Sequence, residues 1–363
     1  MRRKTKLMPS YLPTLFVDLN TVRTNIQLMA EKCQRNELEF RPHFKTHQST
    51  FIGNLFREAG VAGITVSSPV MAQYFVKQGW DDITIAFPAN VNAASVYNEL
   101  LAKCDLKTLV ISTEIVETLD QRLQSPIGLY IEIDPDYGRS GIPASNKTRI
   151  VEVIKAIEQA EHCTLAGFYC HAGHTYKCRS AKEITSVSRK ALAKLTSLKE
   201  SFPHIPICYG DTPSCSVLDD FGPYDQLSPG NFVFYDWMQV EIGSCNKEQI
   251  AIWMSCPVIE KFSKDGKILI HGGAVHFSKE FVESGQEKIF GKVISDDGQL
   301  QGVLASISQE HGIIHCNREY FEQLAVGDTV QVLPVHSCLT ANLMGEYRTE
   351  DAQTIDHMSA KAF

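Results

Sequence analysis

The sequence lacks any apolar run that approaches the roughly 20 residues needed to cross a bilayer. It also lacks the apolar core of a secretory signal. Pro9, Pro13 and Asp18 interrupt the apolar residues that follow the basic start Arg2-Arg3-Lys4. These two absences predict a cytoplasmic protein with no membrane partner.

Paired cysteines and clustered basic residues are also missing. The eleven cysteines form an odd count without CxxC spacing, so we expect reduced and mostly buried thiols rather than a disulfide framework. The net charge is -7, and no basic cluster occurs beyond Arg2-Arg3-Lys4, which argues against a nucleic-acid partner. We find no internal repeat and no low-complexity tract.

What is present is a regular alternation of strand-like and helical segments after residue 37. The 363 residues, of which 44% are hydrophobic, suffice for two cores. Strand followed by helix, repeated about eight times, predicts an α/β fold, a (β/α)8 TIM barrel. The predicted strands are residues 38–44, 63–67, 82–87, 106–111, 127–133, 164–170, 205–209 and 226–234. The predicted helices are residues 51–59, 69–78, 93–102, 113–123, 147–161 and 181–199.

The two ends of the chain have a different pattern. A strand at residues 11–17 precedes the barrel, which it could join, and Asn20 is expected to cap a helix that runs to residue 33. Its predicted inner face is Val22, Ile26, Leu28 and Met29. Beyond Gly243, short strands separated by turns predict a second, mostly β domain. Its predicted strands are residues 251–258, 267–270, 288–294, 302–308 and 329–333. We assign residues 17–243 to the barrel and residues 1–16 and 244–363 to the β domain.

In such a barrel the active site lies at the C-terminal ends of the strands. Lys45 follows the first strand, within Arg41-Pro42-His43-Phe44-Lys45-Thr46-His47. A lysine that has lost its proton is an amine able to form a Schiff base, and partial burial and a cation such as Arg41 would promote that loss. The alternative is a surface lysine in a loop.

Further polar groups follow the fifth and sixth strands. Arg139 lies in a glycine-containing turn, where it could also be a solvated side chain. His171, His174 and Tyr176 come next, and they are able to transfer protons or to hold a ring. Histidines in such a pair can instead be metal ligands or hydrogen-bonded core residues.

Small residues follow the seventh and eighth strands. We predict that Gly210, Thr212, Gly230 and Asn231 bind a phosphate, because these two loops usually form the phosphate site of a barrel. Asp211 would be unfavourable beside a dianion unless its side chain points away.

In the second domain, His336 and Cys338 are two residues apart. In an extended segment they would share one face and could bind one ion. An imidazole and a thiolate suit Zn²⁺ better than Mg²⁺ or Mn²⁺.

These motifs together resemble the D-serine dehydratase and D-threonine aldolase family, pyridoxal-phosphate enzymes with an alanine-racemase-like barrel. The resemblance rests on RPHxKTH around Lys45, the segment from Gly167 to Tyr176, and PxHxC at residues 334–338. It implies pyridoxal 5'-phosphate on Lys45, Arg139 at the pyridine nitrogen and Tyr176 in the cofactor shell. It also implies Zn²⁺, or another divalent metal, on His336 and Cys338, His171 or His174 as acid or base, and a homodimer.

The implied activity is that of a lyase on small D-3-hydroxy amino acids, most similar to a D-serine dehydratase that forms pyruvate and ammonia. Cys338 favours dehydration, because the family's aldolases typically have aspartate there. Glu310 and His311 resemble family residues that could lie behind the metal.

Four alternatives remain open. These are retro-aldol cleavage to glycine and an aldehyde, dehydration of 3-hydroxyaspartate, racemisation and a non-catalytic cofactor carrier. A racemase would need a second base, for which Tyr320 and Tyr347 are candidates. The second domain argues against a carrier.

Overall fold

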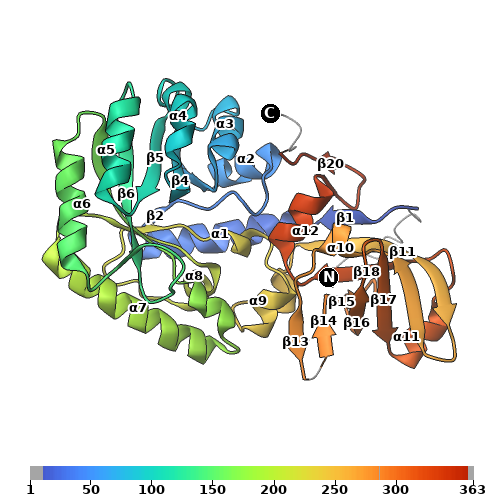
Figure 1. Ribbon diagram of the computed structural model, residues 1–363. Coiled ribbons are helices and arrows are strands. Elements are labelled where there is room, and N and C mark those ends of the chain that lie inside the picture. Colours follow the sequence, from blue (N-terminus) through green and yellow to red (C-terminus); the bar gives the residue numbers. More distant parts are fainter. Residues whose placement is uncertain (1–10, 286, 359–363) are drawn as a thin grey trace. The chain divides into compact units, whose positions relative to one another are not determined.

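The structure, a computed structural model, describes residues 11–285 and 287–358 (Figure 1). The basic start Arg2-Arg3-Lys4 and Pro9 lie outside these residues. The chain forms two compact units. One consists of residues 26–232 and 242–244, and the other of residues 11–25, 233–241, 245–285 and 287–358. The domain limits given above remain our proposal.

The first unit is the predicted barrel, whose eight parallel strands follow one another in chain order. An isolated bridge between His43 and Thr65 closes the ring between β2 and β3. The fold-class prediction is therefore confirmed. The strands are β2 (Glu39–Phe40), β3 (Ile64–Val66), β4 (Asp82–Pro88), β5 (Asp105–Val110), β6 (Ile127–Asp134), β8 (Cys163–Cys170), β9 (Ile207–Tyr209) and β10 (Gln226–Leu227), and β7 (Ile142–Pro143) pairs with the end of β6.

Helices connect the strands and surround them (Figure 1). Hydroxyl and amide side chains at Ser49, Ser68, Asn146 and Ser180 cap four of them, as is usual at helix starts. The helices of the barrel are α2 (Thr50–Glu58), α3 (Pro69–Lys77), η1 (Val91–Ala93), α4 (Ala94–Leu101), α5 (Thr113–Arg122), α6 (Lys147–Gln159), η2 (Gly173–Lys177), α7 (Ala181–Ser201) and α8 (Thr212–Val217). All six predicted helices are present.

Three details of the prediction are wrong. Helix α1 (Leu19–Arg35) begins one residue before Asn20, because the carboxylate of Asp18 accepts the first amide hydrogen bonds. Leu28 is 52% exposed, since it lies off the stripe of buried residues that includes Val22 and Ile26. Strand β10 ends at Leu227, and residues 231–233 form the short helix η3 (Asn231–Val233) instead of continuing the strand.

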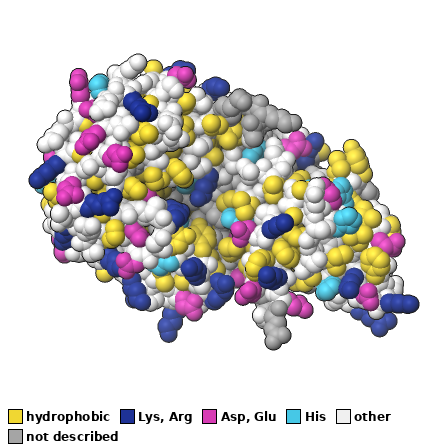
Figure 2. All heavy atoms as spheres, in the orientation of Figure 1, with side chains coloured by type: hydrophobic (Ala, Val, Ile, Leu, Met, Phe, Trp, Pro, Cys, Tyr) yellow, Lys and Arg dark blue, Asp and Glu magenta, His cyan; other side chains and the backbone are white. Residues whose placement is uncertain are grey.

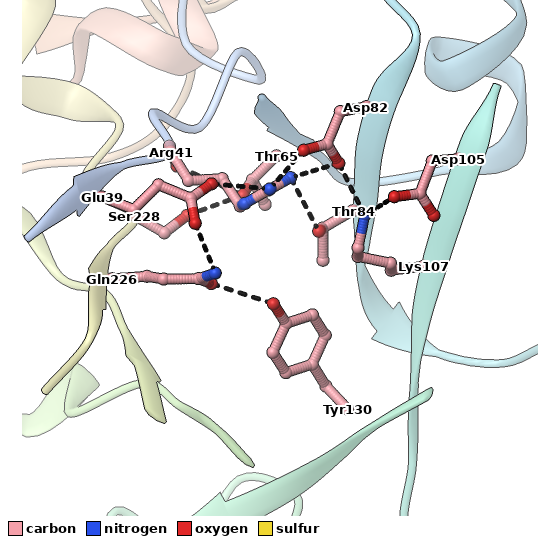
Figure 3. A network of polar contacts seen from close by, with 10 residues as sticks. All are labelled: Glu39, Arg41, Thr65, Asp82, Thr84, Asp105, Lys107, Tyr130, Gln226 and Ser228. Carbon is pink, nitrogen blue, oxygen red and sulfur yellow. Dashed lines mark hydrogen bonds and ion pairs between the residues drawn. The ribbon is translucent and has the colours of Figure 1, made fainter. Parts of the chain in front are cut away.

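A polar network occupies the N-terminal ends of the barrel strands (Figure 3). Arg41 is 2% exposed, and its guanidinium lies 2.5 Å from Asp82 and 2.7 Å from Glu39. Lys107 pairs with the same Asp82 at 2.7 Å and with Asp105 at 2.6 Å. Carboxylates thus hold Arg41 in an ion-pair network that joins β2, β4 and β5, and its effect on Lys45 remains a prediction.

The second unit is the predicted β domain. Its main sheet has the order β12-β17-β16-β15-β18-β11-β1-β19-β20, and β12 also pairs with β11. The strand at the start of the chain, β1 (Thr14–Val17), pairs antiparallel with β11 in this sheet, so it does not join the barrel. The remaining strands are β11 (Ile252–Phe262), β12 (Lys267–His271), β13 (Val282–Ser284), β14 (Glu287–Ile289), β15 (Gly291–Ile294), β16 (Leu300–Ile307), β17 (His311–Cys316), β18 (Thr329–Pro334), β19 (Tyr347–Arg348) and β20 (Thr354–Ile355).

Sequence patterns missed several elements of this unit. Strand β17 was not predicted, nor were the short helices between strands. The predicted strand at residues 288–294 is interrupted at Phe290, which separates β14 from β15. The helices are α9 (Trp237–Glu241), η4 (Lys247–Gln249), α10 (Ala274–Phe277), α11 (Arg318–Gln323) and α12 (Ser337–Met344).

The described residues also show the state of the cysteines, the length of the helices and the distribution of surface charge. All eleven cysteines are free thiols, and most are buried. Within the described residues no helix is long and apolar enough to span a membrane. On the face drawn in Figure 2, basic and acidic side chains are interspersed on both units.

Candidate active site

Lys45 stands in the loop between β2 and α2. Among residues 41–49 it alone is exposed, whereas its neighbours are buried. Phe44 anchors the loop, and its ring centroid lies 5.0 Å from that of Phe56. Ser49 then caps α2. The barrel thus presents the lysine amine from a fixed position, without the partial burial that we expected from the sequence.

Asp134 shapes the loop after β6, from which Arg139 projects. Its carboxylate accepts hydrogen bonds from the amides of Tyr137 at 2.7 Å and Gly138 at 3.1 Å. Asp136 has a φ of +81° in this turn, and its carboxylate pairs with Lys194 on α7. The turn is therefore tied to the strand and to a helix.

Glu132 is a site residue that the sequence patterns missed. Its side chain is 4% exposed, and its Oε1 accepts a hydrogen bond from the Ser140 hydroxyl at 2.7 Å. Arg139 Nη2 lies 3.7 Å from the same oxygen. Oε2 is buried and has no hydrogen-bond partner among the described residues. An acidic residue within an otherwise apolar strand was the signal that could have revealed it.

His171, after β8, is anchored to the next strand. Its Nδ1 lies 2.5 Å from the carbonyl oxygen of Gly210, so Nδ1 carries the proton and Nε2 keeps its lone pair. Burial, then the positive charges of Arg139 and Lys45, lower the pKa of His171 to about 3. The ring is neutral near pH 7 and can accept a hydrogen bond there.

His43 experiences the same cations. Burial, then the charge of Lys45, followed by His171 and Arg139, hold the pKa of His43 well below its ordinary value. Because Lys45 and Arg139 act on both histidines, these four groups lie at the same end of the barrel. The structure thus brings together the predicted lysine, arginine and first histidine.

His174 and Tyr176 lie in η2. The ring of Tyr176 is 6.4 Å from that of His171. Nδ1 of His174 is buried and has no hydrogen-bond partner among the described residues. Burial lowers the pKa of His174, and the carboxylates of Asp211 and Asp134 offset only part of that effect. His174 is therefore a neutral imidazole able to take a proton.

The predicted phosphate residues lie in two loops that touch each other. A Cβ on Gly210 would lie 2.5 Å from the carbonyl oxygen of Ser228, so only glycine fits there. The amide of Phe232, which follows Gly230 and Asn231, donates to the Thr212 hydroxyl at 3.3 Å. Gly210 therefore also has a packing role.

The backbone of these loops retains unused donors. Thr212 and Gly230 are buried, and their amides donate to no acceptor within residues 11–285 and 287–358. Buried amide groups normally have an acceptor. An anion between the two loops would supply one.

Asp211 points away from these donors. Its carboxylate accepts hydrogen bonds from the Ser214 amide at 2.7 Å, the Tyr209 hydroxyl at 2.6 Å and the Thr175 hydroxyl at 3.0 Å. Burial raises the pKa of Asp211, and these hydrogen bonds offset part of the rise. The negative charge of Asp211 therefore does not face the predicted phosphate site.

In the other unit, His336 and Cys338 meet as predicted, although for a different reason. The segment is not extended throughout, because α12 begins at Ser337. Burial disfavours the imidazolium, but the hydrogen bond and charge of Cys338 outweigh it and raise the pKa of His336 to about 9. Nδ1 of His336 is buried with no hydrogen-bond partner among the described residues.

Asp236 is a second residue that sequence patterns missed. It is 1% exposed, and its Oδ2 accepts hydrogen bonds from the amide of Ser337 at 3.0 Å and from its hydroxyl at 3.2 Å. Its charge also acts on His336. Asp236 therefore fixes the start of α12, which carries Cys338.

A separate cluster of His271, His276 and Glu310 could be mistaken for a metal site. Glu310 Oε2 lies 3.3 Å from His271 Nε2 and 3.8 Å from His276 Nε2. However, the amide of Gly273 donates to Nδ1 of His276 at 3.2 Å. The neutral ring then carries its proton on Nε2, the atom that faces Glu310, so this atom offers no lone pair to a metal. His311 is exposed on the neighbouring strand.

The two tyrosines considered as racemase bases serve as packing residues. Tyr347 is fully buried, with its ring 5.5 Å from that of Phe234. Burial raises the pKa of Tyr320, whose hydroxyl lies 3.5 Å from the carbonyl oxygen of Ile294. A proton acceptor would need a lowered pKa and an open hydroxyl.

Comparison with known proteins shows the family to which this chain belongs. A family model described as "Alanine racemase, N-terminal domain" matches residues 17–235. The chain belongs to the alanine racemase N-terminal domain family. In this family member a second model, for a serine dehydratase domain, matches residues 251–349. The two matches fall on the barrel and on the β domain.

Relatives of this family member align over nearly their whole length. D-serine dehydratase of Dictyostelium discoideum is 26% identical, with 92% of each chain covered. D-threo-3-hydroxyaspartate dehydratase of Delftia sp. (strain HT23) is 25% identical, with 93% of each chain covered. The solved structure of the Delftia enzyme matches with a TM-score of 0.89 at 24% identity, over 99% of this chain and 100% of that one. That likeness confirms the fold.

Proposed function

We propose that this chain is a pyridoxal-phosphate-dependent lyase that removes water from a small D-3-hydroxy amino acid, with D-serine as the first substrate to test. The observation that carries the proposal is the gathering of Lys45, Arg139, His43 and His171 at the C-terminal ends of the barrel strands. The dehydratase names of two aligned relatives support the same reaction type.

The residues present fit pyridoxal phosphate. An exposed amine at Lys45 can react with its aldehyde, and the buried amides of Thr212 and Gly230 lack acceptors that a phosphate would supply. Arg139 stays protonated, so it would donate to the pyridine nitrogen without transferring a proton. Bound there, the cofactor supplies an electron-withdrawing ring that stabilises negative charge on the substrate α-carbon.

The protein's own groups would then move the protons. We assign removal of the substrate α-proton to Nζ of Lys45, which would act as a free amine. Nε2 of His171 is unprotonated near neutral pH and would accept a hydrogen bond. His174, also neutral, is the group that we assign to proton transfer at the substrate hydroxyl.

We propose that His336 and Cys338 bind Zn²⁺, or another divalent metal. The imidazole of His336 and the thiol of Cys338, which contact each other, are suitable donors. Bound zinc is a Lewis acid that can stabilise a departing hydroxide. A solved structure of a D-threo-3-hydroxyaspartate dehydratase variant is described as the metal-free form, which supports a metal in related enzymes.

A product assay tests the reaction. The purified protein, with pyridoxal phosphate and Zn²⁺, is given D-serine, D-threonine and D-threo-3-hydroxyaspartate separately. We expect a 2-oxo acid and ammonia from at least D-serine. Glycine plus an aldehyde from D-threonine would instead identify retro-aldol cleavage, as a D-threonine aldolase of Arthrobacter among the relatives would suggest. Racemised substrate without either product would overturn the lyase proposal.

Metal analysis tests the second part. The wild-type protein should purify with about one zinc per chain, and Cys338→Ala should lose it. Cys338→Asp is the matched control, because a carboxylate keeps a negative ligand but favours harder ions such as Mn²⁺. Wild-type protein without metal would contradict the assignment. A homodimer, a cytoplasmic location and a free D-amino acid as the small-molecule partner remain predictions from the resemblance and the composition.

A further inference from the structure

Tyr137 contacts three residues predicted for the site. Its ring centroid lies 5.8 Å from that of His171 and 6.1 Å from that of His174, and Arg139 Cζ is 5.6 Å from it. These are contact distances for aromatic pairs and cation–π pairs. We propose that Tyr137 is a positioning residue, whose ring holds His174 and Arg139 in place for the lyase reaction. The proposal rests on the function proposed above.

The three neighbours depend on this ring to different extents. His171 has its own anchor, the 2.5 Å hydrogen bond to Gly210. The imidazole of His174 has no hydrogen bond with the described residues, and it stacks on Tyr137 with an angle of 28° between the rings. Arg139 is 52% exposed, and its carboxylate partner Glu132 is 3.7 Å away. Loss of the ring should therefore release His174 and Arg139 and leave His171 in place.

Gly173 shows how closely the two loops fit. A Cβ at this position would lie 2.5 Å from Cε1 and Cζ of Tyr137 and 2.9 Å from Nε2 of His171. Its φ lies outside the left-handed region, so the backbone alone does not require glycine. The Tyr137 ring is the nearer of two groups that exclude a side chain there, and His171 is the other. The loop after β6 and the loop after β8 are thus fitted to each other through this aromatic ring.

The ring and the hydroxyl of Tyr137 can be tested separately. No hydrogen bond among the described residues involves the hydroxyl, so Tyr137→Phe keeps every contact described here. Tyr137→Leu keeps an apolar side chain but removes the aromatic face. The two variants therefore form a matched pair that separates ring packing from hydroxyl chemistry.

The first experiment follows the histidine C–H resonances by NMR across pH 5 to 8, without cofactor or substrate. His174 is identified by the signal lost in His174→Gln, and His171 by the signal lost in His171→Asn. We expect Tyr137→Phe to match the wild type and Tyr137→Leu to shift the His174 signals and titration midpoint, with His171 unchanged. A His174 signal unaffected by Tyr137→Leu would overturn the proposal, as would an equal shift with Tyr137→Phe.

This readout does not depend on the proposed reaction, so a protein inactive on all hydroxy amino acids would still test the positioning role. Near-ultraviolet circular dichroism of each variant serves as the folding control. Where Tyr137→Leu fails to fold, Tyr137→Trp provides a second variant, because an enlarged aromatic ring should displace His174 while keeping the loop apolar.

A double-mutant cycle with Gly173→Ala supplies the activity readout. Alone, Gly173→Ala should displace the ring and lower kcat on the order of 10- to 100-fold, as misplaced site groups do. In the Tyr137→Leu background, the same change should lower kcat by a smaller factor, because the Tyr137 ring is gone and only the longer contact with Nε2 of His171, at 2.9 Å, remains. Independent, multiplicative losses would contradict the proposal. For a protein inactive on every substrate, affinity for pyridoxal phosphate replaces kcat in the same cycle.

Discussion

The two ends of the barrel hold their charges in opposite ways. At the N-terminal end, Arg41 is buried between carboxylates at 2.5 and 2.7 Å. At the C-terminal end, Lys45 is exposed and Arg139 has its carboxylate partner only at 3.7 Å. The same sheet therefore carries a buried, closely paired arginine where the strands begin and a half-exposed, more distantly paired arginine where they end.

The difference shows how one fold separates stability from chemistry. A paired, buried cation is costly to disturb and offers nothing to a ligand. The amides of Thr212 and Gly230 and Oε2 of Glu132 have no hydrogen-bond partner among the described residues, so they are available for binding. The four predictions below test this contrast, from the largest expected effect to the smallest.

Lys45→Ala should remove the visible absorbance band that forms with pyridoxal phosphate and lower activity by at least about 10³-fold, because no other amine replaces the nucleophile. The temperature of unfolding without cofactor should stay within about 2 °C of the wild type, since the side chain is exposed. A retained absorbance band would show that the cofactor is bound elsewhere.

Arg41→Leu should destabilise the fold by roughly 3–5 kcal/mol, because Asp82 and Glu39 lose their buried partner. Arg139→Leu is the matched control at the other end. It should change stability less than Arg41→Leu does, because its guanidinium is 52% exposed and 3.7 Å from the buried Glu132, but it should weaken cofactor binding. Urea unfolding and absorbance titration measure the two effects. Equal destabilisation by both variants would show that the two ends of the barrel do not differ in their contribution to stability.

The stability of the wild type should fall as pH decreases from about 6.5 towards 3. His171 titrates near 6.5 when unfolded but has a pKa of about 3 when folded, so the unfolded state gains a proton first in that window. His171→Asn keeps a donor for Gly210 and should reduce the slope by up to about 1.4 kcal/mol per pH unit. An unchanged slope in a series of unfolding curves would contradict a neutral His171.

Asp105→Asn should have the smallest effect, below about 1 kcal/mol, because its side chain is 68% exposed and surface ion pairs contribute little. Its partner Lys107 keeps Asp82 at 2.7 Å. Salt titration of the unfolding midpoint would check the estimate. A loss as large as that of Arg41→Leu would mean that the network acts as one cooperative unit.

Much of the barrel could be predicted from the sequence because its strands and helices have local signatures. The sequence alone reveals apolar strands that are covered on both faces, and it reveals capping serines such as Ser49. Strand β10 was predicted too long, since apolar residues 232–234 resemble a strand although Pro229 and Gly230 interrupt the ladder. The β domain was harder to predict, because its short helices have no periodicity to detect.

Residues of the candidate site could be predicted only where a single short segment contains a recognisable motif. Lys45 and the His336-Cys338 pair lie in short motifs, and the structure retains both. The ion pair of Arg41 with Asp82 was not predicted, because the two residues are 41 positions apart and no local pattern reports it. Glu132 and Tyr137 were missed for the same reason, as each owes its role to contacts between loops of different strands.

The seam between β2 and β3 is closed by few hydrogen bonds. The amide of Phe44 donates to Thr65 at 2.8 Å, and the amide of Thr65 donates to Pro42 at 2.9 Å. Lys45 follows Phe44 directly in the sequence. A group attached to Lys45 is therefore next to the hydrogen bonds that close the barrel between β2 and β3. Deuterium exchange at the Phe44 amide would therefore report how often the barrel opens, and occupancy of the lysine should slow it.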